Sequence, residues 1–321
     1  MWVAATGWIV TGGLAVIAFM RIFAWDDLEP FAVLNSLTAV VYLPAWVVAL
    51  VALVGRRFAL AGAAVLIVAA QIAFLLPELT ATEPLPGWAA TAPSIRLFDA
   101  NVYDNNPSMT GYAAAIKVYK PQLLTMEEAV APDAKKLARA GALAGLPFHL
   151  AVKRDGPRAF LIASRYPLSG DNVVYYDYLP LIVQATVHLP SGPFALWVVH
   201  TTAPVPGSFA QWKSQLDFVA AQVAARGLSK LLVVGDFNAT WGNKGFRSIL
   251  ATGLTDGAAA RGHAFAMTWS QKLGPIPPLV RIDHVLTGTG VAVTKISTGP
   301  GPGSDHRDEM ATVAIRRPAR S

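Results

Sequence analysis

The sequence predicts an α/β domain, with sheets covered by helices, joined to a hydrophobic N-terminal region. Of the 321 residues, 54% are hydrophobic and 14% are charged, whereas a soluble domain has about 25% charged residues. The apolar excess lies at the N-terminus, because the only basic residues between Trp2 and Pro77 are Arg21, Arg56 and Arg57. Beyond that region, short β-branched runs alternate with helical patterns, which is typical of the α/β class.

Three apolar stretches predict three transmembrane helices. They run from Trp2 to Phe23, from Phe31 to Val54 and from Phe58 to Leu76. Each is close to the ~20 residues with which a helix crosses a ~30 Å hydrocarbon layer. The acidic loop Asp26–Glu29 divides the first two stretches, and Arg56-Arg57 divides the last two. An Arg at the centre of a membrane costs about 2.5–3.5 kcal/mol, so the adjacent pair marks a turn at an interface.

Two alternatives to membrane helices exist. A cleaved signal peptide has a basic start and an apolar core of about 7–15 residues, but the first stretch is longer and nothing basic precedes Arg21. The other alternative is that all three stretches are buried helices of a soluble protein. If they are spans, basic loop residues stay in the cytoplasm. Arg56 and Arg57 then predict a cytoplasmic N-terminus, with the Asp26–Glu29 loop and everything after Pro77 on the extracytoplasmic side of the cell membrane.

Composition also divides the chain into parts. Residues 1–84 carry three Lys or Arg against five Asp or Glu (net −2), and the remainder carries 23 against 15 (net +8). A basic domain suits a phosphate-bearing partner, although a surface made basic for solubility explains the charge equally well. The chain has no cysteine, which excludes disulfides and thiolate metal sites.

Prolines mark a boundary between these parts. Pro84, Pro86 and Pro93 lie among small residues in the segment 78–94, which predicts an extended linker. We therefore expect a transmembrane region over residues 1–77 and one folded domain over residues 95–321.

Within that domain, hydrophobic periodicity predicts eight strands and three helices. The expected strands are Ser94–Val102, Gln122–Met126, Phe160–Ala163, Ile182–His188, Phe194–Val199, Lys230–Val234, Ile282–Leu286 and Met310–Ile315. The expected helices are Met109–Tyr119, Asp133–Ala144 and Ser208–Ala225.

Polar side chains gather where these strands end. They are Asn101, Glu127, Glu128, His200, Asp236, Asn238, Asp283, Asp305 and His306. Hydrolysis of a phosphodiester needs charge neutralisation on the phosphate oxygens and an activated water. Carboxylates are hard oxygen ligands suited to Mg²⁺ or Mn²⁺, and amides can donate to phosphate or lend a carbonyl to a metal. A single Asp or Asn at a strand end is more often a turn or cap residue. The hypothesis of a phosphoesterase site therefore rests on the whole set of residues, which recurs at one strand end after another.

The two histidines have different expected roles. His306 could take a proton from water if Asp283 orients its ring and makes it more basic. His200 could hydrogen-bond the phosphate and stabilise developing charge. Tyr166 and His149 are candidates for the acid that protonates the leaving group.

The same residues carry a family resemblance. The segments Gly235-Asp236-Phe237-Asn238 and Ser304-Asp305-His306 resemble the GDFN and SDH motifs of the endonuclease/exonuclease/phosphatase superfamily. Five further segments are similar to its other motifs, in family order over about residues 94–316: Ala100–Val102, Pro121–Glu128, Ala163–Leu168, Val199–His200 and Arg281–Leu286. Glu127 stands where Gln is usual, which leaves open whether Glu127 or Glu128 faces the metal.

The resemblance implies a four-layered αββα sandwich (DNase I-like) after three transmembrane helices, with one active site along the strand ends. It implies that Asn101, Glu128, Asp236 and Asp305 form the Mg²⁺ or Mn²⁺ site. The implied catalytic residues are His200, Asp236, Asn238, Asp283 and His306, with either Asp236 or His306 activating the water.

The predicted function is a membrane-anchored, metal-dependent phosphoesterase. Its substrate could be a nucleic acid, a phospholipid head group or an inositol phosphate, and no feature of the sequence indicates an obligate protein partner. The alternative is a catalytically inactive module of the same fold that binds phosphate or lipid.

Overall fold

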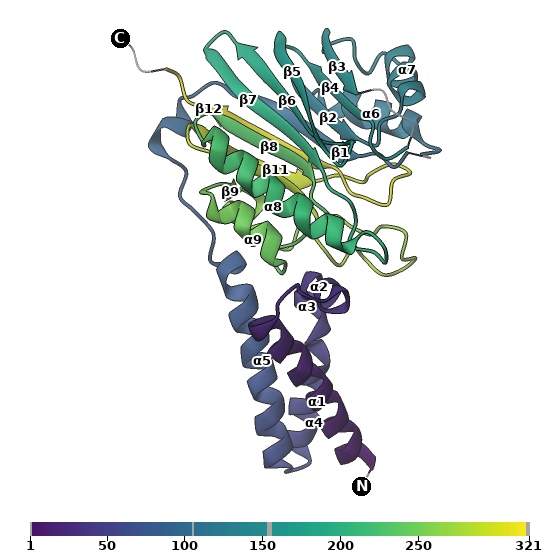
Figure 1. Cartoon of the computed structure of the whole chain (residues 1–321), viewed down its shortest axis with the longest axis vertical. Helices are drawn as coiled ribbons and strands as arrows, with labels where there is room; N and C mark the ends of the chain where they lie inside the picture. The colour runs from purple at the N-terminus through teal and green to yellow at the C-terminus, as the bar shows by residue number, and fades with distance from the viewer. Residues whose placement is uncertain (1, 105, 153–155, 319–321) are drawn as a thin grey trace.

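The computed structural model describes residues 2–104, 106–152 and 156–318, and it has two parts (Figure 1). An elongated helical bundle contains the N-terminal helices α1 to α5. A larger sheet domain (residues 94–318) contains all twelve strands found in the described residues. The bundle meets the sheet domain at one end, and the N-terminus and the α4–α5 turn lie at the other end (Figure 1).

Two bundle helices are long and apolar enough to span a membrane. These spans are Ala4–Phe23 and Phe58–Leu79. The stretch predicted to form the second span is instead broken into three helices, and a third span is present only if the bent pair Glu29–Ser36 and Thr38–Val54, which meet at 80°, is counted as one. The helices are α1 (Trp2–Phe23), α2 (Glu29–Ser36), α3 (Thr38–Val41), α4 (Leu43–Val54) and α5 (Phe58–Leu79).

The break in the second stretch has a physical cause. Pro44 begins α4, where a missing N–H and a preset φ suit the start of a helix and not its continuation. Asn35 and Ser36 are polar, and their side chains bind Asp26 and Asn243 instead of facing lipid. At 1.5 Å per residue, the twelve residues of α4 extend about 18 Å, less than the ~30 Å of a hydrocarbon layer.

Two six-stranded sheets form the sheet domain. The first has the order β11-β12-β1-β2-β4-β3, and the second has the order β5-β6-β7-β8-β10-β9. The first sheet contains β1 (Ser94–Asn101), β2 (Leu123–Glu127), β3 (Phe148–Val152), β4 (Phe160–Ser164), β11 (Val291–Thr298) and β12 (Glu309–Ile315). The second contains β5 (Leu168–Tyr176), β6 (Leu179–Leu189), β7 (Gly192–His200), β8 (Leu231–Asp236), β9 (Thr255–Asp256) and β10 (Asp283–Thr287).

The sheets pack face to face, and helices cover their outer faces. Helices α6 (Met109–Tyr119) and α7 (Ala131–Arg139) lie on the first sheet, whereas α8 (Phe209–Arg226) and α9 (Lys244–Ala251) lie on the second. Alternate residues of β2 show the layering, since Leu123 packs between the sheets and Leu124 packs under α6. This arrangement confirms the predicted αββα sandwich.

All eight predicted strands are present, but four others escaped prediction. β9 has two residues, and β3 and β5 are largely exposed, whereas β11 is eight residues long and rich in β-branched side chains. In β5, for example, Ser169, Gly170 and Asp171 are exposed and read as a turn, yet β6 supplies a pairing partner. The helix expected over Asp133–Ala144 ends at Arg139, because the chain turns through Gly141 at φ 71°.

The bundle and the linker both contact the sheet domain. Ala32 of α2 is fully buried in the same core as Phe237 and Phe246. In the predicted linker, the N–H of Glu83 donates to the carbonyl of Ala260, and the short 3₁₀ helix η1 (Gly87–Ala90) packs its Ala89 against β12. The division at residues 77 and 94 is therefore a change in composition within one packed structure.

Candidate active site

The predicted site residues come together because of strand register. Parallel pairing of β7 and β8 sets His200 beside Asp236, and antiparallel pairing of β8 and β10 sets Asp283 on the other side of Asp236. In the first sheet, parallel pairing of β1 and β2 sets Asn101 beside Glu127. Strands β1, β2, β7 and β8 all end here, so their terminal side chains meet at one place.

Asn101 joins the two sheets at this place. Its side-chain Nδ2 donates to Glu128 Oε1 at 3.1 Å and to Asp236 Oδ2 at 3.0 Å. Asn238 binds the same carboxylate, through its backbone N–H to Oδ1 at 2.7 Å and its Nδ2 to Oδ2 at 3.1 Å. Both amides therefore hold Asp236 in one orientation.

The histidines lie on either side of Asp236. His306 Nδ1 is 3.0 Å from Asp283 Oδ2, and its Nε2 is 3.8 Å from Asp236 Oδ2. His200 Nε2 is 3.6 Å from Asp236 Oδ2 and 3.7 Å from Glu128 Oε1. An orienting carboxylate at one ring nitrogen leaves the other available to the reacting group.

The structure separates the two neighbouring glutamates. Glu128 has φ 60° and its side chain lies at the site, where it also accepts from the backbone N–H of Asp104 at 3.0 Å. Glu127 points between the two sheets, and both its oxygens are buried without a hydrogen-bond partner. Of the two, Glu128 has the position of a metal ligand.

Two predicted residues lie elsewhere, and a third lies at the edge of the site. The side chain of Asp305 accepts from Trp269 Nε1 at 3.0 Å, and its charge helps to raise the pKa of the neighbouring His306. Tyr166 binds Gln122 at the start of β2, at the opposite end of the strands. His149 lies on the exposed edge strand β3.

Burial and neighbouring charges shift the pKa values of the site residues. Burial raises the pKa of Asp236 to about 7 and also raises the pKa of Glu128. Burial lowers the pKa of His306, but Asp283 and Asp236 raise it more, to about 10. Burial, followed by the charge of Arg158, keeps the pKa of His200 well below its usual value.

A divalent cation fits this donor set. Ligand atoms of Asp236, Asp283 and His306 lie within 4.8 Å of one another. Glu128 is adjacent and accepts from Nδ2 of Asn101, whose Oδ1 accepts from the backbone N–H of Tyr103. The carboxylate oxygens of this set suit Mg²⁺ or Mn²⁺. Positive charge there would also favour the ionised form of Asp236, which burial alone disfavours.

Two basic side chains at the site were not predicted from the sequence. Arg158 donates to the backbone carbonyl of His200 and to Thr202 Oγ1. Lys272 lies over the ring of Tyr103, with Nζ 3.7 Å from the ring centroid. Neither residue belongs to a motif or a charge cluster in the sequence, so only the fold places them beside the site.

The comparisons with known proteins agree with this geometry. Residues 95–306 match the model of the Endonuclease/Exonuclease/phosphatase family. No curated protein sequence matches the chain.

Solved structures share the fold of the sheet domain. TDP2 of D. rerio complexed with single strand DNA product is 14% identical, with a TM-score of 0.57 over 69% of this chain and 99% of that one. The 3′ phosphatase NExo from Neisseria bound to a product DNA hairpin is 19% identical, with a TM-score of 0.55 over 68% and 98%. An endonuclease/exonuclease/phosphatase from Beutenbergia cavernae is 18% identical, with a TM-score of 0.52 over 69% and 72%.

Proposed function

Since the chain belongs to the endonuclease/exonuclease/phosphatase family, we propose that it is a membrane-anchored, divalent-metal-dependent phosphoesterase. The observation that carries this proposal is the convergence of Asp283, His306 and Asp236, with His306 held by Asp283 and aimed at Asp236. Asn101, Glu128, His200 and Asn238 complete the site around them.

Each residue has a proposed task. Asp236 and Glu128 would hold the metal ion, with Asn101 Nδ2 bonded to both carboxylates, and the ion would neutralise charge on the phosphate oxygens. Asp283 fixes the ring of His306 through Nδ1. A cation bound beside Asp236 would oppose the rise in the pKa of His306 that Asp236 and Asp283 cause, so that the neutral ring can accept a proton from the attacking water at Nε2. His200 and Asn238 donate hydrogen bonds to the phosphate as negative charge develops.

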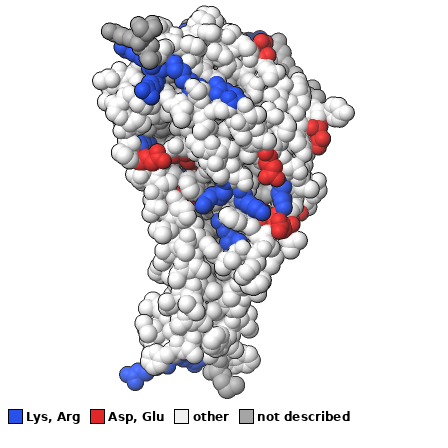
Figure 2. Space-filling model, turned by 60° about the vertical axis from the view of Figure 1, so that its left-hand side comes forward, with Lys and Arg blue, Asp and Glu red and all other residues white. Residues whose placement is uncertain are grey.

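Membrane anchoring is supported by the surface of the bundle. Figure 2 shows no charged side chain along most of the bundle on the visible face, between basic residues at its far tip and mixed charges at the sheet domain. Arg56 and Arg57, in the α4–α5 turn, lie at the same end as the N-terminus (Figure 1). The positive-inside rule then assigns this end to the cytoplasm and the sheet domain to the extracytoplasmic side.

The test is hydrolysis of bis-p-nitrophenyl phosphate by the full chain in detergent micelles with Mg²⁺ or Mn²⁺. We expect EDTA to abolish turnover, and His306→Ala to lower kcat by about 10²–10⁴-fold because the general base is lost. The matched control is His188→Ala, since His188 is exposed on β6 and binds only Ser169. Metal-independent turnover, or full activity in His306→Ala, would contradict the proposal. Metal binding by calorimetry without turnover of any phosphoester would favour the inactive binding module.

A further inference from the structure

One loop connects the candidate active site to the helical bundle. We name it the rim loop (residues 263–280), and it joins α10 (Gly257–Ala260) to β10. At the site, its Trp269 donates to Asp305, its Gln271 side chain donates to the carbonyl of His306, and its Lys272 covers Tyr103. The middle of the loop therefore forms one wall of the site.

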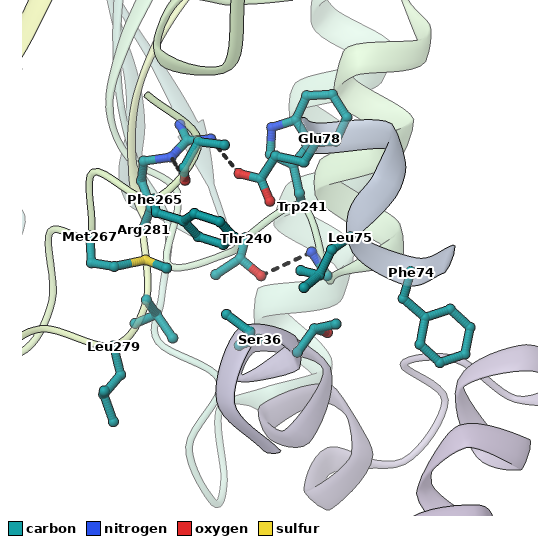
Figure 3. A pocket seen from close by; sticks show the side chains of 15 residues that line it. Ser36, Phe74, Leu75, Glu78, Thr240, Trp241, Phe265, Met267, Leu279 and Arg281 are labelled. Atoms are coloured by element: carbon teal, nitrogen blue, oxygen red, sulfur yellow. Dashed lines mark hydrogen bonds and ion pairs between the residues drawn. The ribbon is translucent and has the colours of Figure 1, made fainter. Parts of the chain in front are cut away.

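The two ends of the rim loop contact the bundle. Phe265, Met267 and Leu279 face Phe74 and Leu75 of α5 across a narrow seam (Figure 3). The part of this seam that water-sized molecules can enter measures about 30 Å³, which is room for about two waters. The rim loop therefore lies close against α5.

A buried ion pair closes the seam at one side. Arg281, just after the rim loop, donates from Nη2 to Glu78 Oε1 of α5 at 2.7 Å (Figure 3). The side chain of Arg281 is 2% exposed and that of Glu78 is 14% exposed. This pair fixes the rim loop against the end of α5, the third predicted span.

Between these two contacts, the rim loop has an apolar tip. The tip (residues 273–277) reads Leu-Gly-Pro-Ile-Pro and is exposed throughout. Leu273 is 43% exposed and Ile276 is 50% exposed. No side chain of the tip is polar, and proline has no N–H to desolvate. Such a segment can enter an apolar phase at lower cost than an ordinary loop, whose backbone donors need partners.

The end of the bundle that meets the sheet domain also has an exposed apolar surface. Near the sheet domain, Ile22, Phe23, Leu76 and Leu79 are between 42% and 71% exposed. At the same junction, Trp25 donates to the carbonyl of Gly242, and Arg247 lies over the ring of Trp241. Aromatic and basic residues of this kind are typical of the level of lipid head groups.

We propose that the rim loop inserts its tip into the bilayer that anchors the bundle, so that the active site acts on phospholipid head groups. This inference rests on the proposed function. A lipid phosphate lies at the boundary between apolar chains and water, and the rim loop places Lys272 next to the tip at that boundary. In the reaction, water attacks phosphorus, one P–O ester bond breaks, and the leaving alcohol oxygen takes up a proton.

The first experiment compares two substrates with the full chain in vesicles of phosphatidylcholine and phosphatidylglycerol. Products of bilayer cleavage are phosphatidic acid or diacylglycerol, depending on which P–O bond breaks, and both are measured. The soluble reference is bis-p-nitrophenyl phosphate. We expect Leu273→Asp combined with Ile276→Asp to lower lipid cleavage at least tenfold, while turnover of the soluble diester changes by less than about twofold, since neither tip residue contacts the metal site. The matched control is Val118→Asp, because Val118 is 84% exposed on α6, away from the bundle (Figure 1).

The second experiment detects insertion without using activity. The chain has no cysteine, so Leu273→Cys and Val118→Cys can each carry one environment-sensitive fluorophore. We expect lipids with a nitroxide on the acyl chain to quench the label at position 273 but not the label at position 118. Equal accessibility of both labels to a water-soluble quencher would overturn the proposal. The proposal would also be overturned if a second copy of the chain shields the label at position 273 in detergent and the nitroxide-bearing lipids do not quench it.

The outcomes separate this inference from the proposed function. Turnover of the soluble diester without cleavage of bilayer lipid would overturn the lipid substrate and leave the phosphoesterase intact. Equal loss of both activities in the tip variant would also overturn it, because the tip would then support the fold and not the substrate. Absence of both activities in the unmodified chain would contradict both proposals.

Discussion

Asp236 and Asp256 are two buried carboxylates in the same sheet, and their surroundings are opposite. Asp256 accepts from Arg281 Nη1 at 2.8 Å, from Trp241 Nε1 at 2.9 Å and from two backbone N–H groups of α10. Burial raises its pKa, but Arg281 lowers it more, so the pKa lies far below the usual range. Asp236 has amide donors and His306, whose Nε2 is 3.8 Å away, but burial outweighs both, and the pKa of Asp236 rises to about 7.

The difference distinguishes a structural network from a functional one. Around Asp256, every charge has a partner inside the protein, including His284, which bridges Asp256 and the carbonyl of Ala239. Around Asp236, the carboxylates of Asp236, Asp283 and Glu128 outnumber the one nearby histidine whose pKa is raised, His306. Groups with strongly perturbed pKa values in an unbalanced cluster mark functional sites more often than structural ones. Strand β10 supplies both networks, because His284 and Asp283 point to opposite sides.

Replacement of Asp236 should give the largest difference between the effect on activity and the effect on stability. Asp236→Asn keeps the shape of the side chain but removes the charge that would hold the metal. We expect kcat on bis-p-nitrophenyl phosphate to fall by about 10³–10⁴-fold, as for loss of a residue in the catalytic set. Without metal, stability should stay the same or increase, because a buried charge without a cation is lost. Chemical unfolding in EDTA measures the second effect, and an unstable variant would contradict the comparison.

Replacement of Asp256 should have the reverse effect. Asp256→Asn leaves the guanidinium of Arg281, which is 2% exposed, without its main counter-charge. Removal of one partner of a buried pair costs about 3–5 kcal/mol, so the free energy of unfolding should fall by this amount. Asp171→Asn on exposed β5 is the control and should change it by less than about 0.5 kcal/mol. Retained stability in Asp256→Asn would show that the network around it is not structural.

The carboxylate of Glu127 extends the comparison, because it is buried without a hydrogen bond to the residues around Asp236 or around Asp256. Burial, then the charge of Asp99, raises the pKa of Glu127 well above its usual value. A group whose pKa is raised on folding stabilises the protein fully below its unfolded pKa of about 4.5 and loses this contribution as pH rises towards the folded value. Glu127→Gln should abolish this loss of stability with rising pH, which is at most about 1.4 kcal/mol for each pH unit.

The measurement for Glu127→Gln is denaturant unfolding at several pH values in EDTA. We expect the variant and the unmodified chain to be similar in stability near pH 5, and the variant to be more stable at pH 8. A difference that does not grow with pH would mean that Glu127 does not titrate as its burial implies. Glu128→Gln, one residue away at the site, should instead lower metal-dependent activity.

The sequence predicted the site better than the contacts that support it. Asp236, Asp283 and His306 lie in motifs, so their side-chain types and their order could be predicted from the sequence alone. Asp256 lies between a threonine and a glycine in no motif, and its partners Trp241 and Arg281 are distant in the chain. Likewise, the apolar composition of residues 31–54 predicted a helix, but the break arises from contacts of Asn35 and Ser36 with other segments. The composition of a segment shows how much apolar surface it can bury, but not which other segment it will contact.

The smallest predicted effect concerns the contact between the bundle and the site. Asp26, in the α1–α2 connection, accepts from the backbone N–H of Lys244 at 2.5 Å and from Asn35 Nδ2 at 2.7 Å. Helix α9 has no cap from its own Asn243 side chain, so the carboxylate of Asp26 caps it from 218 residues away in the sequence.

Loss of a helix cap costs about 1 kcal/mol, so Asp26→Ala should lower the free energy of unfolding by this amount. Asp26→Asn should recover part of it, since an amide oxygen can still accept from the N–H. The neighbouring Asp27→Ala is the control, because Asp27 is exposed and pairs only with Lys213 at 3.3 Å. Helix α9 follows the turn that contains Asn238, and Asp26→Ala should therefore also decrease kcat slightly, with Asp26→Asn restoring it. A stability change equal to that of Asp27→Ala would mean that the bundle anchors the sheet domain without supporting its active site.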